Sequence, residues 1–436
     1  MSTQPVNADV VIVGAGFSGI AAGRELSNLG QKTIIVEGRD RIGGRTWTKE
    51  SPIGLNLEMG GTWVHPSMAH VWSEINRYNI ALHITPFAQK AWWRAGQQIN
   101  SGTPDDLACL VDVGMNEFLP QAGEAFPFPH TPYPLTDLAR QLDAKSAADV
   151  IETLDLTEEQ RSVLDGIWAL HFNSVSSRGG FLTALRWAAL ANNDWRYLAE
   201  ITERYKLVNG TQELINAMHR DSQAQVVLNT TVEAITEDEQ GVTITTSEGQ
   251  SYRAKHVIVT APVNALKNIT FTGPYDPASL GIAEEGQAAN GLKVWMRVKG
   301  NLEPFHCLGT SEDTFVWIQY ETELDGDSVL VAFSPDATRI DGNNIDEVTQ
   351  ALHVFRPDLE VLEVDSHDWV ADPFAQQTWV IYRPNQLSAD AETLHTKNTR
   401  IWLAGADYAH GWTSFIDGAI EAGIKTARNI YRGENK

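Results

Sequence analysis

Cysteine is scarce in this sequence, which has only Cys109 and Cys307 among its 436 residues. Two thiols cannot form the disulfide framework of a small secreted protein, so a reducing compartment is the default expectation. The chain also lacks any run of about 18 apolar residues, the length that a membrane-spanning helix needs. Met1–Ala8 has neither the basic nor the apolar stretch of a secretory signal. The expected location is therefore the cytoplasm, without a membrane partner.

Positive charge is also in short supply, because 33 Lys and Arg residues stand against 56 Asp and Glu residues, giving a formal net charge of −23. Nucleic acid and anionic membranes repel such a chain and are not expected partners. A cationic small molecule would be weakly attracted, although acidity serves solubility equally well. The ordinary apolar content of 42% indicates a globular protein, and no metal site is expected.

The length exceeds that of one ordinary domain, which favours two domains that share a cofactor cleft. The N-terminus reads as a buried strand at Asp9–Val13, a helix at about 18–29 and a second strand at Lys32–Glu37. The remaining expectations are a mostly helical stretch at 71–205, a β-meander at 226–259, an alternating strand at 291–298, a strand at 401–404 and a helix at 417–431.

A glycine-rich turn, Gly14-Ala15-Gly16-Phe17-Ser18-Gly19, joins the first strand to the first helix and fits the dinucleotide-binding pattern G-x-G-x-x-G. Gly14 makes the tight turn, Gly16 lets the backbone approach a pyrophosphate, and Gly19 lets the helix pack on the strand. The helix N-terminus, with Ser18, would face the phosphates. Glu37 ends the second strand, where a carboxylate accepts hydrogen bonds from a ribose. A dinucleotide site is therefore predicted.

The next segment, 39–46, places Arg39 and Arg45 on either side of a Gly43-Gly44 step and indicates FAD rather than NAD. Arg45 would meet the pyrophosphate, while the glycines let the backbone come close. A basic surface loop is the competing interpretation. A second cluster, Gly60-Gly61-Thr62-Trp63, offers backbone that can lie against a flat ring.

With these motifs the sequence resembles the flavin-containing amine oxidases, among them the monoamine, polyamine and bacterial 6-hydroxynicotine oxidases. The resemblance covers most of the chain in order but is poor at about 89–156. The residues around Lys293 and the segment Asp368-Trp369-Val370-Ala371-Asp372-Pro373 look most like the corresponding segments of the 6-hydroxynicotine oxidases. The segments that carry it are 9–46, 58–63, 256–262, 291–293, 368–374, 405–407 and 417–423.

The resemblance implies an α/β (α+β) fold like that of p-hydroxybenzoate hydroxylase. In it, a Rossmann-type FAD-binding domain (1–75, 206–275 and 370–436) is interleaved with a substrate domain of mixed sheet and helices (76–205 and 276–369). It also implies that Val232 contacts the adenine and that Asp407 bonds the ribityl or pyrophosphate oxygens. Trp369 would lie beside the flavin ring. The last helix, preceded by Phe415 and Ile416, would point its N-terminus at the flavin and stabilise negative charge there.

The same resemblance implies the reactive centre. Trp379 and Phe415 occupy the positions of two aromatic side chains that flank the amine in front of the flavin; both are tyrosines in monoamine oxidases. Lys293 would hold a water at flavin N5 and assist oxygen reduction, although lysines on strands are usually solvated. Thr378 stands where monoamine oxidases carry the cysteine that links the flavin, so the FAD is expected to be non-covalent.

Substrate contacts are less sharply indicated. His171 lies one helical turn after Ile167 and Trp168, on their inward face, and is a candidate for binding the far end of the substrate or an ordinary core histidine. Asn173 is the competing match to a substrate-binding asparagine in nicotine-type relatives. Trp317 and Tyr320 stand on one strand with opposite parity, so at most one of them should face the pocket.

The function expected is oxidation of the C–N bond of a secondary, N-heterocyclic or aryl-alkyl amine by hydride transfer to flavin N5, with O2 as acceptor. Alternatives are a primary monoamine oxidase, an amine dehydrogenase with a cytochrome acceptor, and a redox-inactive FAD scaffold. An L-amino acid oxidase would need a buried arginine, for which Arg186 and Arg356 are the candidates. The assembly is left open, with a homodimer among the options.

Overall fold

A five-stranded parallel sheet is the centre of the first lobe in the computed structural model, which describes residues 5–390, 393–395 and 400–434. Each strand except β11 is apolar and largely buried, as expected for a sheet covered on both faces. The predicted strands at 9–13, 32–37 and 401–404 are confirmed, while Met1–Gln4 lie outside the described residues. The order is β11 (Gln225–Val227), β3 (Thr33–Val36), β2 (Val10–Val13), β15 (His256–Val259) and β22 (Ile401–Leu403).

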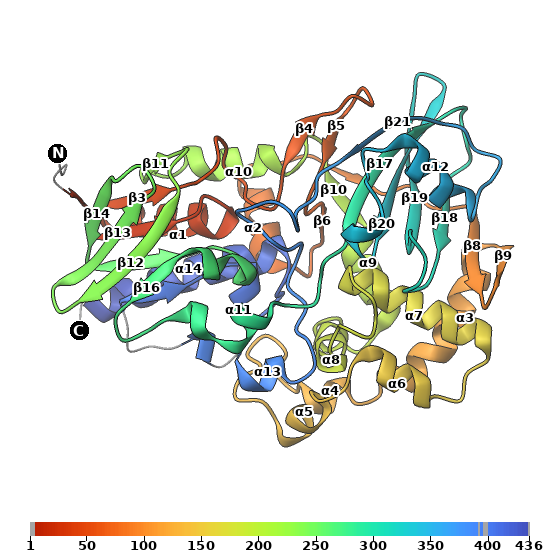
Figure 1. The fold of residues 1–436 in the computed structure, drawn as a ribbon, viewed down its shortest axis with the longest axis horizontal. Coiled ribbons are helices and arrows are strands. Elements are labelled where there is room, and N and C mark those ends of the chain that lie inside the picture. Colours follow the sequence, from red (N-terminus) through yellow and green to blue (C-terminus); the bar gives the residue numbers. More distant parts are fainter. Residues whose placement is uncertain (1–4, 391–392, 396–399, 435–436) are drawn as a thin grey trace.

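Two long helices, α1 (Phe17–Asn28) and α14 (Ile416–Glu434), pack against each other on this sheet (Figure 1). They bring the first and last segments of the chain together. Gly423 permits the contact, because a Cβ there would lie 2.3 Å from the backbone oxygen of Ser18. The predicted helices at 18–29 and 417–431 are confirmed.

A second, five-stranded sheet adjoins it and corrects the meander predicted at 226–259. Only β12, β13 and β14 form a meander, whereas β11 and β15 join the parallel sheet. Val257, Ile258 and Val259 are fully buried without alternation, which is typical of a parallel strand rather than a meander strand. The order is β1 (Val6–Asn7), β14 (Ser251–Ala254), β13 (Gly241–Thr246), β12 (Val232–Asp238) and β16 (Thr270–Thr272).

The second lobe contains a seven-stranded sheet, shown in teal and orange in Figure 1. The alternation predicted at 291–298 is confirmed: Leu292, Val294 and Met296 pack in a core with α12 (Ile345–His353), while Lys293 and Trp295 take the opposite face. The order is β21 (Val361–Ser366), β17 (Leu292–Val298), β20 (Asp327–Ser334), β19 (Trp317–Leu324), β18 (Phe305–Leu308), β8 (Lys90–Ala95) and β9 (Gln98–Gly102).

Helices cover the lower side of this lobe in Figure 1, as predicted for much of 71–205, but residues 82–84, 90–95 and 98–102 form strands. β8 and β9 form a hairpin across Gly96, whose φ is +60°, and β8 pairs with β18 from a distant part of the chain. The pairing with β18 is a long-range contact that the local pattern does not show. The helices are α2 (Ala69–Arg77), α3 (Pro104–Phe118), α4 (Ala122–Ala125), α5 (Asp137–Leu142), α6 (Ala147–Thr153), α7 (Glu158–Phe172), α8 (Phe181–Leu190) and α9 (Trp195–Glu203).

Shorter elements connect the lobes. A three-stranded antiparallel sheet lies beside the end of α9 and contributes Trp63 to the space between the lobes. The connecting elements are β4 (Thr48–Glu50), β5 (Asn56–Glu58), β6 (Trp63–Val64), β7 (Leu82–Ile84), β10 (Tyr205–Leu207), α10 (Thr211–Arg220), α11 (Gly281–Glu285) and α13 (Gln386–Ala389).

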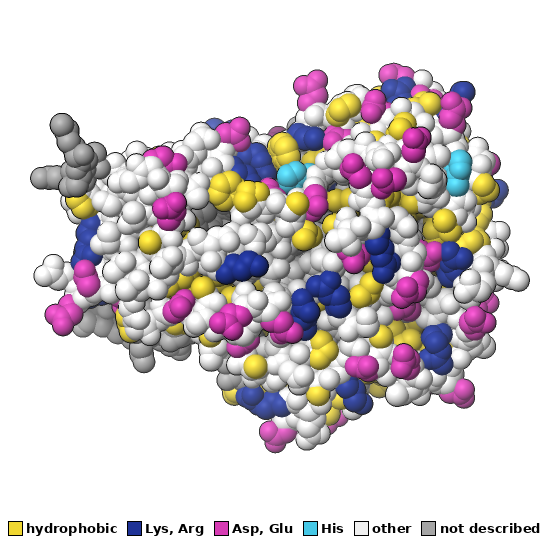
Figure 2. All heavy atoms as spheres, in the orientation of Figure 1, with side chains coloured by type: hydrophobic (Ala, Val, Ile, Leu, Met, Phe, Trp, Pro, Cys, Tyr) yellow, Lys and Arg dark blue, Asp and Glu magenta, His cyan; other side chains and the backbone are white. Residues whose placement is uncertain are grey.

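The first lobe is thus assembled from N-terminal, middle and C-terminal segments, and the second from the stretches between them (Figure 1). Figure 2 shows carboxylate side chains spread over both lobes, with Lys and Arg between them. Cys109 is exposed and Cys307 is buried, and both are free thiols. Within the described residues, none of the helices is long and apolar enough to cross a membrane.

Candidate active site

One cavity of about 590 Å³ extends between the lobes and is lined by residues from both. Its wall joins the glycine turn and the ends of the parallel strands to an aromatic chamber beneath the seven-stranded sheet. The predicted residues among its lining are Gly14, Gly16, Ser18, Glu37, Arg39, Gly44, Arg45, Gly60, Gly61, Thr62, Trp63, His171, Asn173, Val232, Lys293, Trp317, Trp369, Trp379, Phe415 and Ile416.

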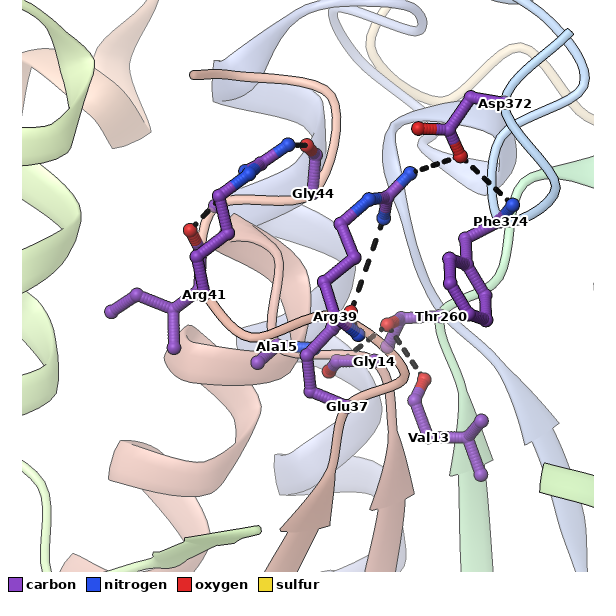
Figure 3. Close-up of polar contacts among 12 residues, drawn as sticks. Val13, Gly14, Ala15, Glu37, Arg39, Arg41, Gly44, Thr260, Asp372 and Phe374 are labelled. Carbon is purple, nitrogen blue, oxygen red and sulfur yellow. Dashed lines mark hydrogen bonds and ion pairs between the residues drawn. The ribbon is translucent and has the colours of Figure 1, made fainter. Parts of the chain in front are cut away.

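The glycine turn is held tightly against neighbouring backbone. Gly14 has a φ of +103°, and a Cβ there would lie 2.4 Å from Oγ1 of Thr260, whose hydroxyl donates to the carbonyl of Val13 (Figure 3). Gly19 packs against the turn from behind, since a Cβ on it would lie 2.0 Å from the oxygen of Gly14. The two glycines therefore shape the turn, and Gly19 acts through packing, as the motif predicts.

The N-terminus of α1 is open toward the cavity. Its N-cap residue, Gly16, offers no side-chain cap, and the first turn contains no acidic residue. The Oγ of Ser18 is buried, lines the cavity and has no hydrogen-bond partner among the described residues. Free N–H groups, a positive dipole end and an unsatisfied hydroxyl together suit a phosphate.

Glu37 anchors the neighbouring loop. Its carboxylate accepts hydrogen bonds from the backbone N–H of Ala15, at 2.7 Å, and of Arg39, at 2.9 Å (Figure 3). The guanidinium of Arg39 bonds to Asp372 at 2.6 Å and lies 5.2 Å from the ring of Phe374. Burial opposes ionisation of Asp372, but the bond from His367 and the charge of Arg39 outweigh it and lower the pKa of Asp372 to about 2.

Arg45 connects the cofactor side of the cavity to the C-terminal segment. Its Nη1 donates to the carbonyl of Thr378 at 2.7 Å, and its Nη2 donates to Asp407 at 2.6 Å. Asp407 also accepts from the N–H of Val263 and from the Nε2 of Gln377, both at 2.9 Å. Asp407 is not among the described residues that line the cavity. It lies behind Arg45 and orients the guanidinium of that residue.

Lys293 is buried on the cavity side of β17. Its ammonium donates to the carbonyls of Glu58, at 3.1 Å, and Gly60, at 2.7 Å, and to Oγ1 of Thr62, at 2.7 Å. The nitrogen lies 5.3 Å from the ring of Trp63. Burial lowers the pKa of Lys293 to about 8. The lysine therefore ties the second glycine cluster to the sheet, and it loses its charge a little above neutral pH.

Aromatic side chains form the walls of the chamber. The indole Nε1 of Trp379 donates to the carbonyl of His171 at 3.0 Å. The ring of Phe415 lies 5.1 Å from Trp187 and 5.4 Å from Trp412. Trp369 donates from Nε1 to the carbonyl of Met59 at 3.0 Å. Such packed rings exclude water and leave π-faces toward whatever the chamber holds.

His171 presents an unsatisfied nitrogen to this chamber. Its Nδ1 lies 2.8 Å from the carbonyl of Ile167, one helical turn earlier, and so carries the proton. The Nε2 is buried and has no hydrogen-bond partner within the described residues. Burial lowers the pKa of His171, which keeps the ring neutral and makes Nε2 an acceptor.

Asn173 closes α7 in a left-handed conformation, with a φ of +46°. Its Nδ2 donates to Oγ1 of Thr378 at 3.0 Å, and its backbone carbonyl accepts from Asn290 and Gly291. The side-chain oxygen is buried without a hydrogen-bond partner in the described part of the chain. His171 and Asn173 both line the cavity, so both stay candidates for binding the substrate.

The comparisons with known proteins agree with this geometry. The model of the family described as flavin containing amine oxidoreductase matches residues 17–431. The chain belongs to this family. FAD is therefore its cofactor, and the protein is a flavin-dependent amine oxidase. The predicted family resemblance, fold class and cofactor are confirmed.

Individual relatives extend over nearly the whole chain. A nicotine dehydrogenase of Pseudomonas putida is 33% identical over 97% of this chain and 88% of its own length. An (S)-6-hydroxynicotine oxidase of Paenarthrobacter nicotinovorans is 29% identical over 95% of this chain and 97% of its own length. The solved structure of a putrescine oxidase bound to putrescine superposes with a TM-score of 0.85, at 21% identity, over 98% of this chain and all of that one.

The amine oxidase has groups that suit each part of FAD. Glu37 would accept from the adenosine ribose, and the N-terminus of α1 with Ser18 and Arg45 would hold the pyrophosphate. Val232 lines the cavity near Thr230 and Thr231, where the adenine would lie. When bound, FAD supplies the two-electron acceptor for the reaction.

Trp317 and Tyr320, of which at most one was expected to face the pocket, lie on opposite faces of β19. Trp317 lines the cavity, and its Nε1 donates to Oε1 of Gln319 at 3.0 Å. Tyr320 packs in the core under α12, on the opposite face of β19. The strand is regular from Trp317 to Tyr320 and its irregularity follows them, so residues three apart point to opposite faces. The structure therefore removes Tyr320 from the candidate substrate contacts.

Several lining residues escaped the sequence analysis. Gln319 lines the cavity and its Nε2 has no hydrogen-bond partner among the described residues. Trp187 and Phe333 add to the aromatic wall. Glu203 also lines the cavity, at the C-terminal end of α9. A carboxylate at that end of a helix opposes the dipole, and this mismatch is a signal that could have identified it.

Proposed function

We propose that the protein oxidises a secondary, N-heterocyclic or aryl-alkyl amine of the nicotine type at the carbon next to nitrogen, with transfer of hydride to FAD. One observation carries the proposal: a single cavity is lined both by the dinucleotide-binding turn at Gly14 and by the aromatic pair Trp379 and Phe415. The relatives named for nicotine and 6-hydroxynicotine support the substrate class.

The chamber favours the reactive form of an amine. An amine has an ordinary pKa of about 10 and is protonated in water, but only its neutral form can release hydride. Apolar walls disfavour the cation by desolvation, and Trp379 and Phe415 would orient the nitrogen between their rings. The neutral His171 has Nε2 free to accept a hydrogen bond from a substrate N–H or O–H group.

The charges in the cavity argue against an amino acid as the substrate. Arg186 donates to the carbonyls of Ala409 and His410, and Arg356 bonds to Asp358. The arginines that line the cavity among the described residues are Arg39 and Arg45, both bonded to aspartates. A substrate carboxylate would therefore lack an unpaired arginine in the chamber.

FAD is proposed to bind without a covalent link, since Thr378 has no thiol and its hydroxyl is bonded to Asn173. The electron acceptor is proposed to be O2, with Lys293 as the assisting group. The nicotine dehydrogenase relative is named as a dehydrogenase rather than an oxidase, which favours a second candidate with an acceptor other than O2. A cytochrome is the acceptor proposed for it.

Anaerobic flavin reduction across a substrate panel tests the proposal. Cyclic and N-methyl secondary amines that carry an aromatic ring should bleach the flavin faster than primary alkyl amines and L-amino acids. Bleaching by amino acids alone would overturn it. The reduced enzyme, mixed separately with O2 and with a cytochrome c, then identifies the acceptor by the faster reoxidation.

A further inference from the structure

Glu203 introduces a carboxyl group into a cavity that is otherwise built for a neutral amine. The residue lines the cavity, and within the described residues its carboxylate has no hydrogen bond and no ion pair. Its backbone carbonyl accepts from the hydroxyl of Thr85. Burial alone raises the pKa of Glu203 to about 7. Glu203 is partly exposed and lines the cavity, and a cationic ligand that pairs with its desolvated carboxyl group would stabilise the charged form.

Neighbouring cations do not pair with Glu203. Arg204, the next residue, places its guanidinium 4.1 Å from the ring of Phe87, and its Nε has no hydrogen-bond partner among the described residues. Lys206 forms an ion pair with Glu321, and Lys293 directs its ammonium to Glu58, Gly60 and Thr62. None of these cations forms an ion pair with Glu203, so a cationic ligand inside the cavity would be its first partner.

Glu203 belongs to a different wall from the reactive aromatic pair. Thr85 links it to Trp63, because the Nε1 of Trp63 donates to Oγ1 of Thr85 at 3.2 Å, and Trp63 lies 6.1 Å from Phe333. His171, Trp187 and Phe415 instead form a chain of adjacent rings on the other wall. A carboxylate beside the reacting nitrogen would stabilise the ammonium form, which cannot release hydride. Glu203 therefore suits a second nitrogen.

The remaining unsatisfied groups include acceptors for a ligand with N–H donors. The Nε2 of His171 and the Oδ1 of Asn173 are buried acceptors without partners in the described residues, and both residues line the cavity. Among the same lining residues the Nε2 of Gln319 is an unpaired buried donor, and the hydroxyl of Ser18, at the N-terminus of α1, also has no partner. The two acceptors on His171 and Asn173 can receive N–H groups of a molecule bound in the chamber.

We propose that the substrate carries a second, protonated nitrogen, and that the carboxylate of Glu203 binds it while the first nitrogen reacts between Trp379 and Phe415. This inference rests on the proposed function and narrows its substrate class to dibasic amines. Glu203 is then a specificity-determining residue, because it distinguishes a terminal ammonium from a methyl group of the same size.

The test compares two series of N-methylalkylamines of increasing chain length, one ending in an ammonium group and the other in a methyl group. Anaerobic stopped-flow reduction of the holoenzyme separates the apparent dissociation constant from the limiting rate. At the best chain length, the ammonium series should bind at least about tenfold more tightly than its methyl counterpart, the typical effect of one hydrogen bond to a charged group.

Variants connect this preference to one side chain. Glu203→Gln should abolish the preference while leaving binding of the methyl series unchanged, and Glu203→Asp should keep it with an optimum one methylene longer. Glu200→Gln is the matched control, because Glu200 lies on the same helix with its side chain 48% exposed near His65. Equal affinity for the two series in the unmodified enzyme would overturn the proposal and leave amine oxidation intact. Failure of both series and of simple aromatic amines to reduce the flavin would instead overturn the proposed function.

Discussion

The indole of Trp379 donates its N–H to the backbone carbonyl of His171, at 3.0 Å, across 208 residues of sequence. This bond joins the segment after β21 to the last turn of α7. One wall of the chamber is therefore positioned by the substrate-side helix as well as by its own loop. The two side chains offer different contacts to a bound molecule: Trp379 offers a ring face, and the imidazole of His171 offers an acceptor nitrogen.

Replacement of Trp379 tests the first of these contacts. Trp379→Ala should raise the apparent substrate dissociation constant and slow flavin reduction by about tenfold to a hundredfold, because the amine loses one of its two orienting rings. Trp379→Phe keeps a ring but loses the bond to His171, so its effect should be several-fold smaller. Anaerobic stopped-flow measurements give both constants. Unchanged reduction in Trp379→Ala would remove this residue from the reactive site.

Much of the fold could be predicted because its signals are local. The unbroken apolar runs at 10–13 and 34–36 indicate buried parallel strands. The glycine turn between the first of these strands and α1 indicates the strand–turn–helix unit of a dinucleotide-binding fold. The strands at 90–95 and 98–102 were missed because the hairpin that they form joins the sheet through the pairing of β8 with β18, more than 200 residues away. Local propensity contains no information on that partner.

The site was predictable to a similar degree. Alternation along β17 was sufficient to put Lys293 and Leu292 on opposite faces, and helical spacing was sufficient to turn His171 inward. Sequence could not show that Asp407 reaches the site through Arg45, since the pair is 362 residues apart. Glu203 was also missed: a carboxylate at the C-terminal end of a helix is a local signal, but its lack of a partner among the described residues is visible only in the structure.

Glu37 should control cofactor retention. The carboxylate of Glu37 accepts hydrogen bonds from the N–H groups of Ala15 and Arg39 and would accept others from the ribose hydroxyls of FAD. Glu37→Gln removes its negative charge, so FAD affinity should fall by about tenfold or more. The measurement is the ratio of bound flavin to protein after dialysis. Asp40→Asn is the matched control, because Asp40 lies in the same loop and is exposed. Equal flavin retention in the two variants would contradict the role.

The proposed non-covalent attachment makes a direct prediction about denatured protein. Acid precipitation should release all of the flavin into the supernatant, because Thr378 offers a hydroxyl, bonded to Asn173, where a thioether would require a thiol. Flavin fluorescence in the supernatant, compared with the total from a protease digest, measures the released fraction. A pellet that retains flavin would show another attachment point.

Lys293 should act in the oxidative half of the cycle. Lys293→Met keeps an unbranched apolar side chain but removes the charge, and reoxidation by O2 should slow much more than reduction by amine. Lys206→Met is a useful control because it also removes a buried lysine, one that pairs with Glu321 rather than with the second glycine cluster. Stopped-flow mixing of the reduced enzyme with O2 gives the rate constant. Equal effects on both half-reactions would assign Lys293 a structural role.

The pH dependence distinguishes charge from packing at this lysine. Burial lowers the pKa of Lys293 to about 8, so the ammonium is present below that pH and is lost above it. If its charge assists electron transfer to oxygen, the reoxidation rate constant should fall as pH rises through about 8 in the unmodified enzyme. In Lys293→Met it should be low and constant across the same range, since no charge remains to be lost. If Lys293→Met shows the same pH profile, another group causes the pH dependence. The role of Lys293 would then be structural, through its three hydrogen bonds with Glu58, Gly60 and Thr62.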